Sequence, residues 1–273
     1  MSAATKLNSL FSVAGKNVLV TGGSRGIGLM IAKGFVDAGA KVLLTSRDEK
    51  ACAEAAESLK SDNVQYVASN VSTREGCVAL ASHTASVFDN KLDVLVNNAG
   101  ASWGEPLDRD SGKANWGFDK VFDLNVKGLF YLTRECIPLL KRETGDDPGR
   151  VINIGSVAGM VPQEAPTHAY DASKAAVHHL TKDLARELAP KHITVNVLAP
   201  GFVPSRMSAG LATWGGDAQA LANKIPLGRM GEEDDMAGAA IFLSSKASSW
   251  CTGVILNVDG GTVGAMPIPL SSL

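Results

Sequence analysis

A tyrosine and a lysine four positions apart, Tyr170 and Lys174, have the residue types and the spacing that proton transfer requires. Positions four apart share one face of a helix, so the phenol and the ammonium can enter the same site. A nearby ammonium favours phenolate over phenol, and we therefore expect Lys174 to lower the pKa of Tyr170 from about 10. Such a pair also arises by chance, so its meaning depends on the elements that surround it.

A glycine-rich segment follows the first predicted strand. The β-branched residues 16–20 predict a buried strand, and residues 29–38 have the pattern of a helix. Between them, Gly22, Gly26 and Gly28 are placed to form a tight turn that holds a pyrophosphate at the start of a helix. Strand, glycine turn and helix form half of a βαβ unit, so the predicted ligand is a dinucleotide. A turn with a purely structural role is the alternative.

The end of the second predicted strand, residues 41–45, bears on the choice of cofactor. Proteins that bind NAD carry Asp or Glu here, whereas this chain has Ser46 and Arg47. A guanidinium and a hydroxyl suit the 2′-phosphate of NADPH, and Arg25 in the glycine turn could reach the same group. We therefore predict NADPH/NADP+ as the cofactor, with Asp48 as the cap of the next helix. Solvated surface charges are the alternative for both arginines.

Strands and helices alternate along the whole chain, which predicts an α/β fold. We expect one domain over residues 1–273, a doubly wound (Rossmann) parallel sheet with helices on both faces. Further strands are predicted at residues 64–68, 92–96, 151–154, 193–198 and 254–258, and helices at 49–60, 73–88, 121–140, from the tyrosine to about 188, and at about 234–243. Residues 102–119 are predicted to form a loop beside the site, and residues 202–229 a mobile lid.

The composition narrows the classes of function. The 273 residues are 45% hydrophobic and 20% charged, with a formal net charge of −2. Neither nucleic acid nor a membrane is therefore an expected partner, and no apolar run is long enough to span a bilayer. No secretory signal is recognisable, and the terminal Ser-Ser-Leu resembles a peroxisomal signal only faintly. Four scattered cysteines predict reduced thiols in a cytoplasmic protein without a metal cluster: Cys52, Cys77, Cys136 and Cys251.

Taken together and in this order, the motifs resemble those of the short-chain dehydrogenase/reductase family over nearly the whole chain. They are residues 21–28, Asn97-Asn98-Ala99-Gly100, Asn125, Ser156, Tyr170 with Lys174, and Pro200-Gly201. Within the family the chain is most similar to NADPH-dependent 3-oxoacyl reductases of the rhamnolipid-pathway type, on residues 21–28, 98–104, 151–159 and 204–207. Asn70 departs from the usual Asp beside the adenine. Gly155 stands where a second serine is frequent, which leaves Ser156 as the candidate hydroxyl.

The resemblance implies that a ketone is reduced to a secondary alcohol. Ser156 would hydrogen-bond to the carbonyl oxygen, Tyr170 would protonate it, Lys174 would bind the nicotinamide ribose, and Asn125 would hold a water of a proton relay. A strand-end cap is the structural alternative for Ser156, and a helix-kink amide for Asn125. The implied cofactor contacts are Gly22, Ser24, Arg25, Gly26, Ile27, Gly28, Ser46, Arg47, Asn70, Val71, Asn98, Ala99, Gly100, Tyr170, Lys174, Pro200, Gly201 and Val203.

The predicted substrate pocket is largely apolar, which favours 3-oxoacyl chains and aryl ketones over polyols. Its candidate residues are Trp103, Met160, His168, Phe202, Met207 and Trp214, with Arg206 at the rim for the phosphate of a carrier group. The alternatives are a dehydrogenase of a sugar alcohol, steroid or other secondary alcohol, and a non-catalytic NADP-binding regulator. His178, His179 and His192 are expected on helix surfaces. The resemblance also suggests a homotetramer, built from the helices beginning near residues 121 and 172 and the C-terminal strand.

Overall fold

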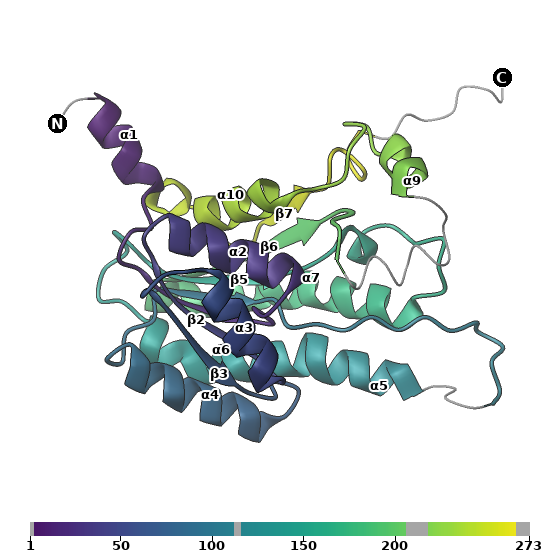
Figure 1. Ribbon diagram of the computed structural model, residues 1–273, viewed down its shortest axis with the longest axis horizontal. Coiled ribbons are helices and arrows are strands. Elements are labelled where there is room, and N and C mark those ends of the chain that lie inside the picture. Colours follow the sequence, from purple (N-terminus) through teal and green to yellow (C-terminus); the bar gives the residue numbers. More distant parts are fainter. Residues whose placement is uncertain (1–2, 112–115, 206–217, 266–273) are drawn as a thin grey trace.

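The computed structural model describes residues 3–111, 116–205 and 218–265, and it is organised around one seven-stranded parallel sheet (Figure 1). The strands run in the order β3-β2-β1-β4-β5-β6-β7, and every neighbouring pair is parallel. Their bounds are β1 Asn17–Thr21, β2 Lys41–Ser46, β3 Val64–Ala68, β4 Val94–Asn97, β5 Gly149–Ile154, β6 Ile193–Pro200 and β7 Ile255–Val258. The predicted α/β fold is thus confirmed.

Helices cover both faces of the sheet (Figure 1). One face carries α2 (Gly26–Asp37), α3 (Glu49–Ser58) and α10 (Glu233–Ser244), and the other carries α4 (Arg74–Val87), α6 (Leu129–Leu140) and α7 (His168–Leu188). Three shorter helices complete the described set: α1 (Ala3–Phe11), α5 (Trp116–Phe122) and α9 (Ala218–Lys224).

Alternation along the strands divides the core into two layers. In β1, Val18 and Val20 belong to the cluster that includes Phe35 of α2, whereas Leu19 belongs to the cluster that includes Leu80 of α4. Successive side chains of a strand point to opposite faces, and the helices on both faces bury every side chain of β4, β5 and β6, whereas the edge strand β3 stays largely exposed. This arrangement explains why the central strands are rich in Val, Leu and Ile on both faces.

Three segments differ from the sequence-based expectations. No element is predicted before residue 16, yet α1 forms there, with Leu7 57% exposed. The predicted loop 102–119 includes the start of α5. The predicted helix 121–140 is interrupted by a π-helical turn, Asp123–Gly128. At Gly128 the backbone passes so close to Val71 that a Cβ atom would lie 2.1 Å from the Val71 carbonyl oxygen, so the widened turn packs against the loop after β3.

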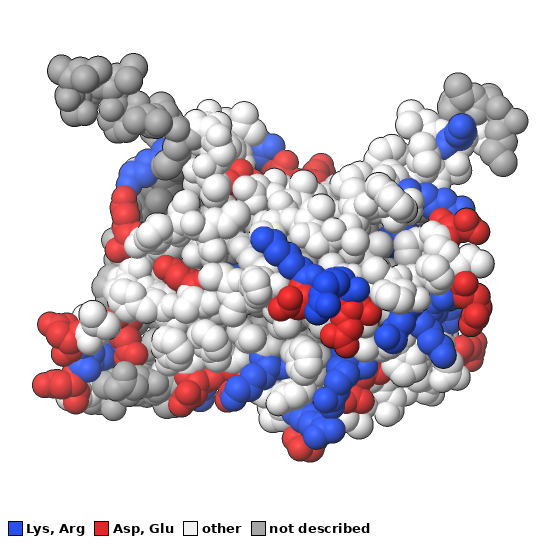
Figure 2. Space-filling view, turned by 180° about the vertical axis from the view of Figure 1, so that it is seen from behind, with Lys and Arg blue, Asp and Glu red and all other residues white. Residues whose placement is uncertain are grey.

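The charged side chains of the surface and the apolar character of the helices bear on possible partners. Figure 2 shows Lys and Arg side chains lying beside Asp and Glu side chains, so the face in view has no continuous patch of one sign. Among the helices of the described ranges, no segment combines the length and the apolar character that crossing a membrane needs.

Candidate active site

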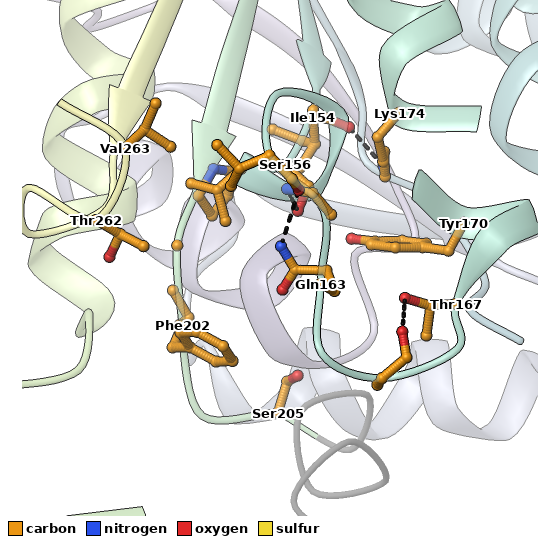
Figure 3. A pocket seen from close by; sticks show the side chains of 18 of the residues that line it. Ile154, Ser156, Gln163, Thr167, Tyr170, Lys174, Phe202, Ser205, Thr262 and Val263 are labelled. Carbon is orange, nitrogen blue, oxygen red and sulfur yellow. Dashed lines mark hydrogen bonds between the residues drawn. The ribbon is translucent and has the colours of Figure 1, made fainter. Parts of the chain in front are cut away.

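A cavity of about 410 Å³ lies at the carboxyl edge of the sheet (Figure 3). Loops that follow different strands meet there: Asn98 and Gly100 follow β4, Ser156 follows β5, Gly201 follows β6 and Thr262 follows β7. Carboxyl ends of parallel strands share one edge, which is where open α/β sheets bind ligands. The motifs that are far apart in the sequence are therefore brought to one place by the topology.

Ser156 and Tyr170 meet inside this cavity. Ser156 begins the short 3-10 turn Val157–Gly159, and its Oγ accepts a 3.2 Å hydrogen bond from the Ala158 N–H. Tyr170 lies in the first turn of α7, and its hydroxyl group points into the cavity toward Ser156 (Figure 3). A hydrogen bond joins the two side chains. The predicted cap and the predicted catalytic hydroxyl are thus the same group, because capping uses only acceptor capacity of Oγ.

Lys174 lies one helical turn beyond Tyr170 on the same face of α7, as the spacing predicts. Its Nζ atom donates a 2.7 Å hydrogen bond to the carbonyl oxygen of Ile154, the last residue of β5 (Figure 3). The same Nζ lies 5.5 Å from the centroid of the Tyr170 ring. Burial lowers the pKa of Lys174 to about 8, since taking an ammonium out of water disfavours its charged form.

The expected lowering of the Tyr170 pKa is wrong for this structure. Burial raises the pKa of Tyr170, and the hydrogen bond from Ser156 offsets only part of that effect. The ammonium of Lys174 donates to the Ile154 carbonyl, and its charge is not among the effects that set the pKa of Tyr170. Tyr170 is consequently a protonated phenol at neutral pH, a state that suits a proton donor.

Asn125 lies in the π-helical turn, a feature that often occurs at functional sites. Its Oδ1 accepts from the N–H of Ala101, and its Nδ2 donates to the Ala101 carbonyl and to Ser173 Oγ, all at 2.9–3.0 Å. The side chain therefore ties the loop after β4 to α7. Its role in a water relay stays a prediction, because these contacts occupy the amide.

The glycine turn has the shape that a dinucleotide phosphate group requires. Gly22 and Gly26 adopt left-handed conformations, with φ of 63° and 55°, and α2 begins at Gly26. A Cβ atom at Gly28 would lie 2.3 Å from the Gly22 carbonyl oxygen, so only glycine lets the helix approach the turn this closely. Asn98 Nδ2 holds the turn in place through bonds to the carbonyls of Thr21 and Gly22.

The two predicted phosphate-binding arginines are both exposed. Arg25 directly precedes α2, and Arg47 follows β2 with Ser46. Asp48 caps α3 by accepting from the Ala51 N–H at 3.1 Å, which confirms the predicted cap. Because its carboxylate is engaged with the helix, Asp48 does not take the place of an NAD-selecting acid. The end of β2 thus presents the Arg47 guanidinium, rather than a free carboxylate, to the ribose.

The remaining predicted cofactor residues lie along the same edge. Ile27, Pro200, Gly201 and Val203 line the cavity together with the residues named above. Ser24 lies in the glycine turn, and Ala99 follows β4, where its N–H donates a 3.0 Å hydrogen bond to Thr21 Oγ1. Asn70 is exposed after β3, where its Oδ1 accepts from Ser72, and Val71 is buried beside it.

The substrate-pocket prediction needs correction at three positions. Trp103 packs against α5, where a Cβ atom at Gly117 would lie 2.0 Å from its Cγ, and it does not line the cavity. Met160 ends the 3-10 turn and His168 is exposed at the start of α7, so neither lines the cavity either. Phe202 does line it. Met207, Trp214 and the rim residue Arg206 lie outside the described residues.

Several cavity residues were missed by sequence reasoning. Lys224 ends α9 and Ile225 directly follows it, whereas Val263 follows β7, where Figure 3 shows it at the edge of the cavity. Val263 was predictable, since the seventh strand ends at the same edge as the others. Lys224 and Ile225 lie at the end of a short helix, whose position beside the cavity no sequence pattern fixes.

His178 was expected on the helix surface, and that expectation is wrong. It is only 5% exposed and lies one turn beyond Lys174 on the inner face of α7, whereas the neighbouring His179 is exposed as predicted. Its Nε2 accepts a 3.4 Å hydrogen bond from the backbone N–H of Ser156. Burial, followed by the charges of Lys174 and Lys182, lowers the pKa of His178 to about 4.

Comparisons with known proteins agree with this geometry. The family described as "Enoyl-(Acyl carrier protein) reductase" matches residues 22–263. The chain is 44% identical over 260 residues to the rhamnolipids biosynthesis 3-oxoacyl-[acyl-carrier-protein] reductase of Pseudomonas aeruginosa, covering 93% of this chain and 99% of the relative. It is 35% identical over 257 residues to the galactitol 2-dehydrogenase (L-tagatose-forming) of Cereibacter sphaeroides, covering 93% and 97%.

The chain also resembles a solved structure over nearly its whole length. The Pseudomonas aeruginosa RhlG/NADP active-site complex superimposes with a TM-score of 0.87 at 43% identity, covering 93% of this chain and 98% of that one. The family match, the sequence relative and the structural relative all cover more than four fifths of this chain. The chain belongs to the short-chain dehydrogenase/reductase family.

Proposed function

We propose that this protein is an NADPH-dependent carbonyl reductase that converts 3-oxoacyl thioesters or esters, or apolar and aryl ketones, to secondary alcohols. The observation that carries the proposal is the convergence of Ser156, Tyr170 and Lys174 in one cavity that is continuous with the glycine turn at Ile27. The relatives whose names specify 3-oxoacyl reduction and NADP support it. A non-catalytic regulator would have no need for this arrangement.

The cofactor-binding residues fit a dinucleotide phosphate. The left-handed glycines and the start of α2 would hold the pyrophosphate, and Arg25 with Arg47 would hold the 2′-phosphate. When bound, the reduced nicotinamide supplies the hydride that the carbonyl carbon accepts. One domain would then carry both the cofactor and the substrate. Residues 206–217, the middle of the predicted lid, lie outside the described residues.

The residues of the chain perform the rest of the reaction. As negative charge develops on the carbonyl oxygen, the Ser156 hydroxyl donates a hydrogen bond to it. The Tyr170 phenol donates a second bond and then its proton, so the ketone becomes a secondary alcohol. Lys174 holds its ammonium beside the Tyr170 ring, where it would also bind the ribose of the cofactor. Asn125 fixes the loop after β4 to α7 through Ser173.

The lining of the cavity supports an apolar substrate. Ile154, Val161, Phe202 and Val263 contribute carbon surface, and a polyol buried against them would lose hydrogen bonds to water. At the rim, Lys224 on α9 pairs with Glu164 at 3.4 Å, with the side chains 60% and 87% exposed. An exposed pair of this kind opens at little cost, so Lys224 is available to the phosphate of a carrier group.

We expect kcat/KM to be highest for a 3-oxoacyl thioester, lower for an aryl ketone and lowest for a ketose. Each is measured by NADPH oxidation with the purified protein. Lys224→Gln should raise KM for the thioester and leave KM for a short 3-oxo ester unchanged, since the ester has no carrier phosphate. A clear preference for the ketose would instead favour a sugar-alcohol dehydrogenase, the alternative that the galactitol relative represents.

We expect NADPH to be preferred over NADH, and Arg47→Asp to erode that preference about ten- to a hundred-fold. A guanidinium contact to phosphate is charge-assisted, and the substituted carboxylate would repel the 2′-phosphate. The measurement is kcat/KM for each cofactor. Lys41→Asp is the matched control, because it makes the same change of charge at the other, exposed end of β2. Equal kcat/KM for both cofactors in the unmodified protein would contradict the assignment.

We also propose a cytoplasmic homotetramer. Four free thiols, three of them buried, suit a reducing compartment. β7 is an edge strand of the sheet, and near it Trp250 is 98% exposed and Val254 39% exposed, which leaves apolar surface that a second copy would cover. Light scattering at micromolar concentration should give about four times the mass of the chain. A monomer would refute the proposed assembly.

A further inference from the structure

The turn that carries Ser156 rests on the imidazole of His178. A Cβ atom at Gly155 would lie 2.4 Å from His178 Nε2, and one at Gly159 would lie 2.8 Å from His178 Cε1. The ring therefore touches both ends of the segment that contains Ser156 and the 3-10 turn. The ring fills the space that a side chain at position 155 would need. This contact explains why Gly155 stands where a second serine is frequent.

The contact is polar as well as steric. The Ser156 N–H donates to His178 Nε2, while the Gly155 N–H is taken by the Leu198 carbonyl of β6 and the Gly159 N–H by the Ser156 carbonyl. These three backbone N–H groups thus have three different acceptors, and the imidazole supplies one of them. An accepting Nε2 requires a neutral ring with its proton on Nδ1.

The His178 imidazole is neutral at neutral pH, because its pKa is lowered to about 4. His178 is buried, and the charged groups that act on it, Lys174 and Lys182, are both cationic and both on its own helix. Gly155, which follows β5, and Gly159 of the 3-10 turn face the ring, and Val197 of β6 lies beside it at Gly155. None of these three residues titrates. Its Nε2 therefore remains an acceptor well below neutral pH.

We propose that His178 is a positioning residue for the reaction, which sets the position of the Ser156 hydroxyl by holding the backbone of its turn. The inference rests on the proposed role of Ser156. Tyr170, Lys174 and His178 lie at successive four-residue steps on α7, so one helix face carries the proton donor, the ammonium and the support of the second hydroxyl. Without the imidazole, the Ser156 N–H loses its acceptor in a buried place and the turn is free to shift.

The test compares His178→Leu, which removes the acceptor, with His178→Gln, whose amide oxygen can reach the place of Nε2. We expect His178→Leu to lower kcat about ten- to a hundred-fold with little change in the Kd for NADPH, because small displacements of a catalytic group are costly. His178→Gln should stay within about threefold of the unmodified protein. His179→Leu is the control, since that neighbouring side chain is 79% exposed.

A double-mutant cycle decides whether the effect acts through Ser156. In the Ser156→Ala background, His178→Leu should add less than about threefold to the loss, because the hydroxyl that it positions is gone. The same fold loss in both backgrounds would overturn the inference, and so would unchanged kcat in His178→Leu. Full activity of Ser156→Ala alone would instead overturn the proposed active site.

A folding defect in His178→Leu would not block the test. His178→Asn is then compared with His178→Gln, since both are neutral amides and the shorter side chain falls short of the Ser156 N–H. At least about tenfold higher kcat in the Gln variant would support the inference, and equal kcat would overturn it.

Discussion

Replacing Tyr170 with Phe should lower kcat for ketone reduction by at least about a hundred-fold while leaving the Kd for NADPH nearly unchanged. The substitution keeps the ring that packs beside Lys174 and removes the hydroxyl group that bonds with Ser156. Burial holds the pKa of that hydroxyl above its ordinary value, so at neutral pH it carries the proton that the alcohol product needs. The Ser156 hydroxyl that remains can polarise the carbonyl but has no partner from which to regain a proton.

The measurement is steady-state NADPH oxidation with the best ketone of the substrate panel, together with cofactor binding by fluorescence. Tyr131→Phe is the matched control. Tyr131 lies on α6 with its ring beside Phe130 and Arg134, and it is not among the residues of the cavity. Near-normal turnover in Tyr170→Phe would show that another group supplies the proton, and the catalytic assignment would fail.

The parts of the site that the sequence predicts are those fixed by regular elements. Five strands end beside the cavity, and the rule that parallel sheets bind ligands at their carboxyl edge places Asn98, Ser156 and Gly201 together before any coordinates are known. The placement of Tyr170 and Lys174 is predictable for the same reason, since helical geometry alone puts residues four apart on one face.

The parts that the sequence does not predict depend on where a neighbouring segment goes. Trp103 is a large aromatic residue of the kind that lines pockets, but its ring packs against α5 at Gly117. The effect of Lys174 on Tyr170 depends on the acceptor to which the ammonium donates, and in this fold that acceptor is the Ile154 carbonyl. His178 and His179 are identical in type, so only the phase of α7, counted in fours from Tyr170, could separate the buried one from the exposed one.

Replacing Lys174 with Met should lower kcat/KM by at least about a hundred-fold and weaken NADPH binding about tenfold, with no loss of thermal stability. Methionine keeps most of the buried apolar stem and removes the ammonium, which is placed beside Tyr170 and where the ribose hydroxyls of the cofactor would lie. A charge-assisted hydrogen bond to the ribose accounts for the change in Kd. Lys182→Met, on the exposed face of the same helix, is the matched control.

The stability of Lys174→Met should not fall together with its activity, because folding lowers the pKa of Lys174. Folding lowers the pKa of Lys174 from 10.5 to about 8, so below pH 8 the folded protein carries a charge that burial disfavours by about 3 kcal/mol. Loss of the bond to the Ile154 carbonyl offsets part of the gain on removing that charge. The unmodified protein should regain stability relative to Lys174→Met as pH rises from 8 toward 10.5, where the folded state has released the proton and the unfolded state has not.

That pH dependence separates a catalytic loss from a folding defect. Thermal unfolding of both proteins is followed between pH 7 and 10, alongside reduction by the unmodified enzyme, which should decline above about pH 8 as Lys174 loses its proton. An inactive Lys174→Met protein that is also several degrees less stable at pH 7 would point to a structural role for the ammonium. An active one, or one with an unaltered Kd for NADPH, would remove one of the two tasks assigned to Lys174.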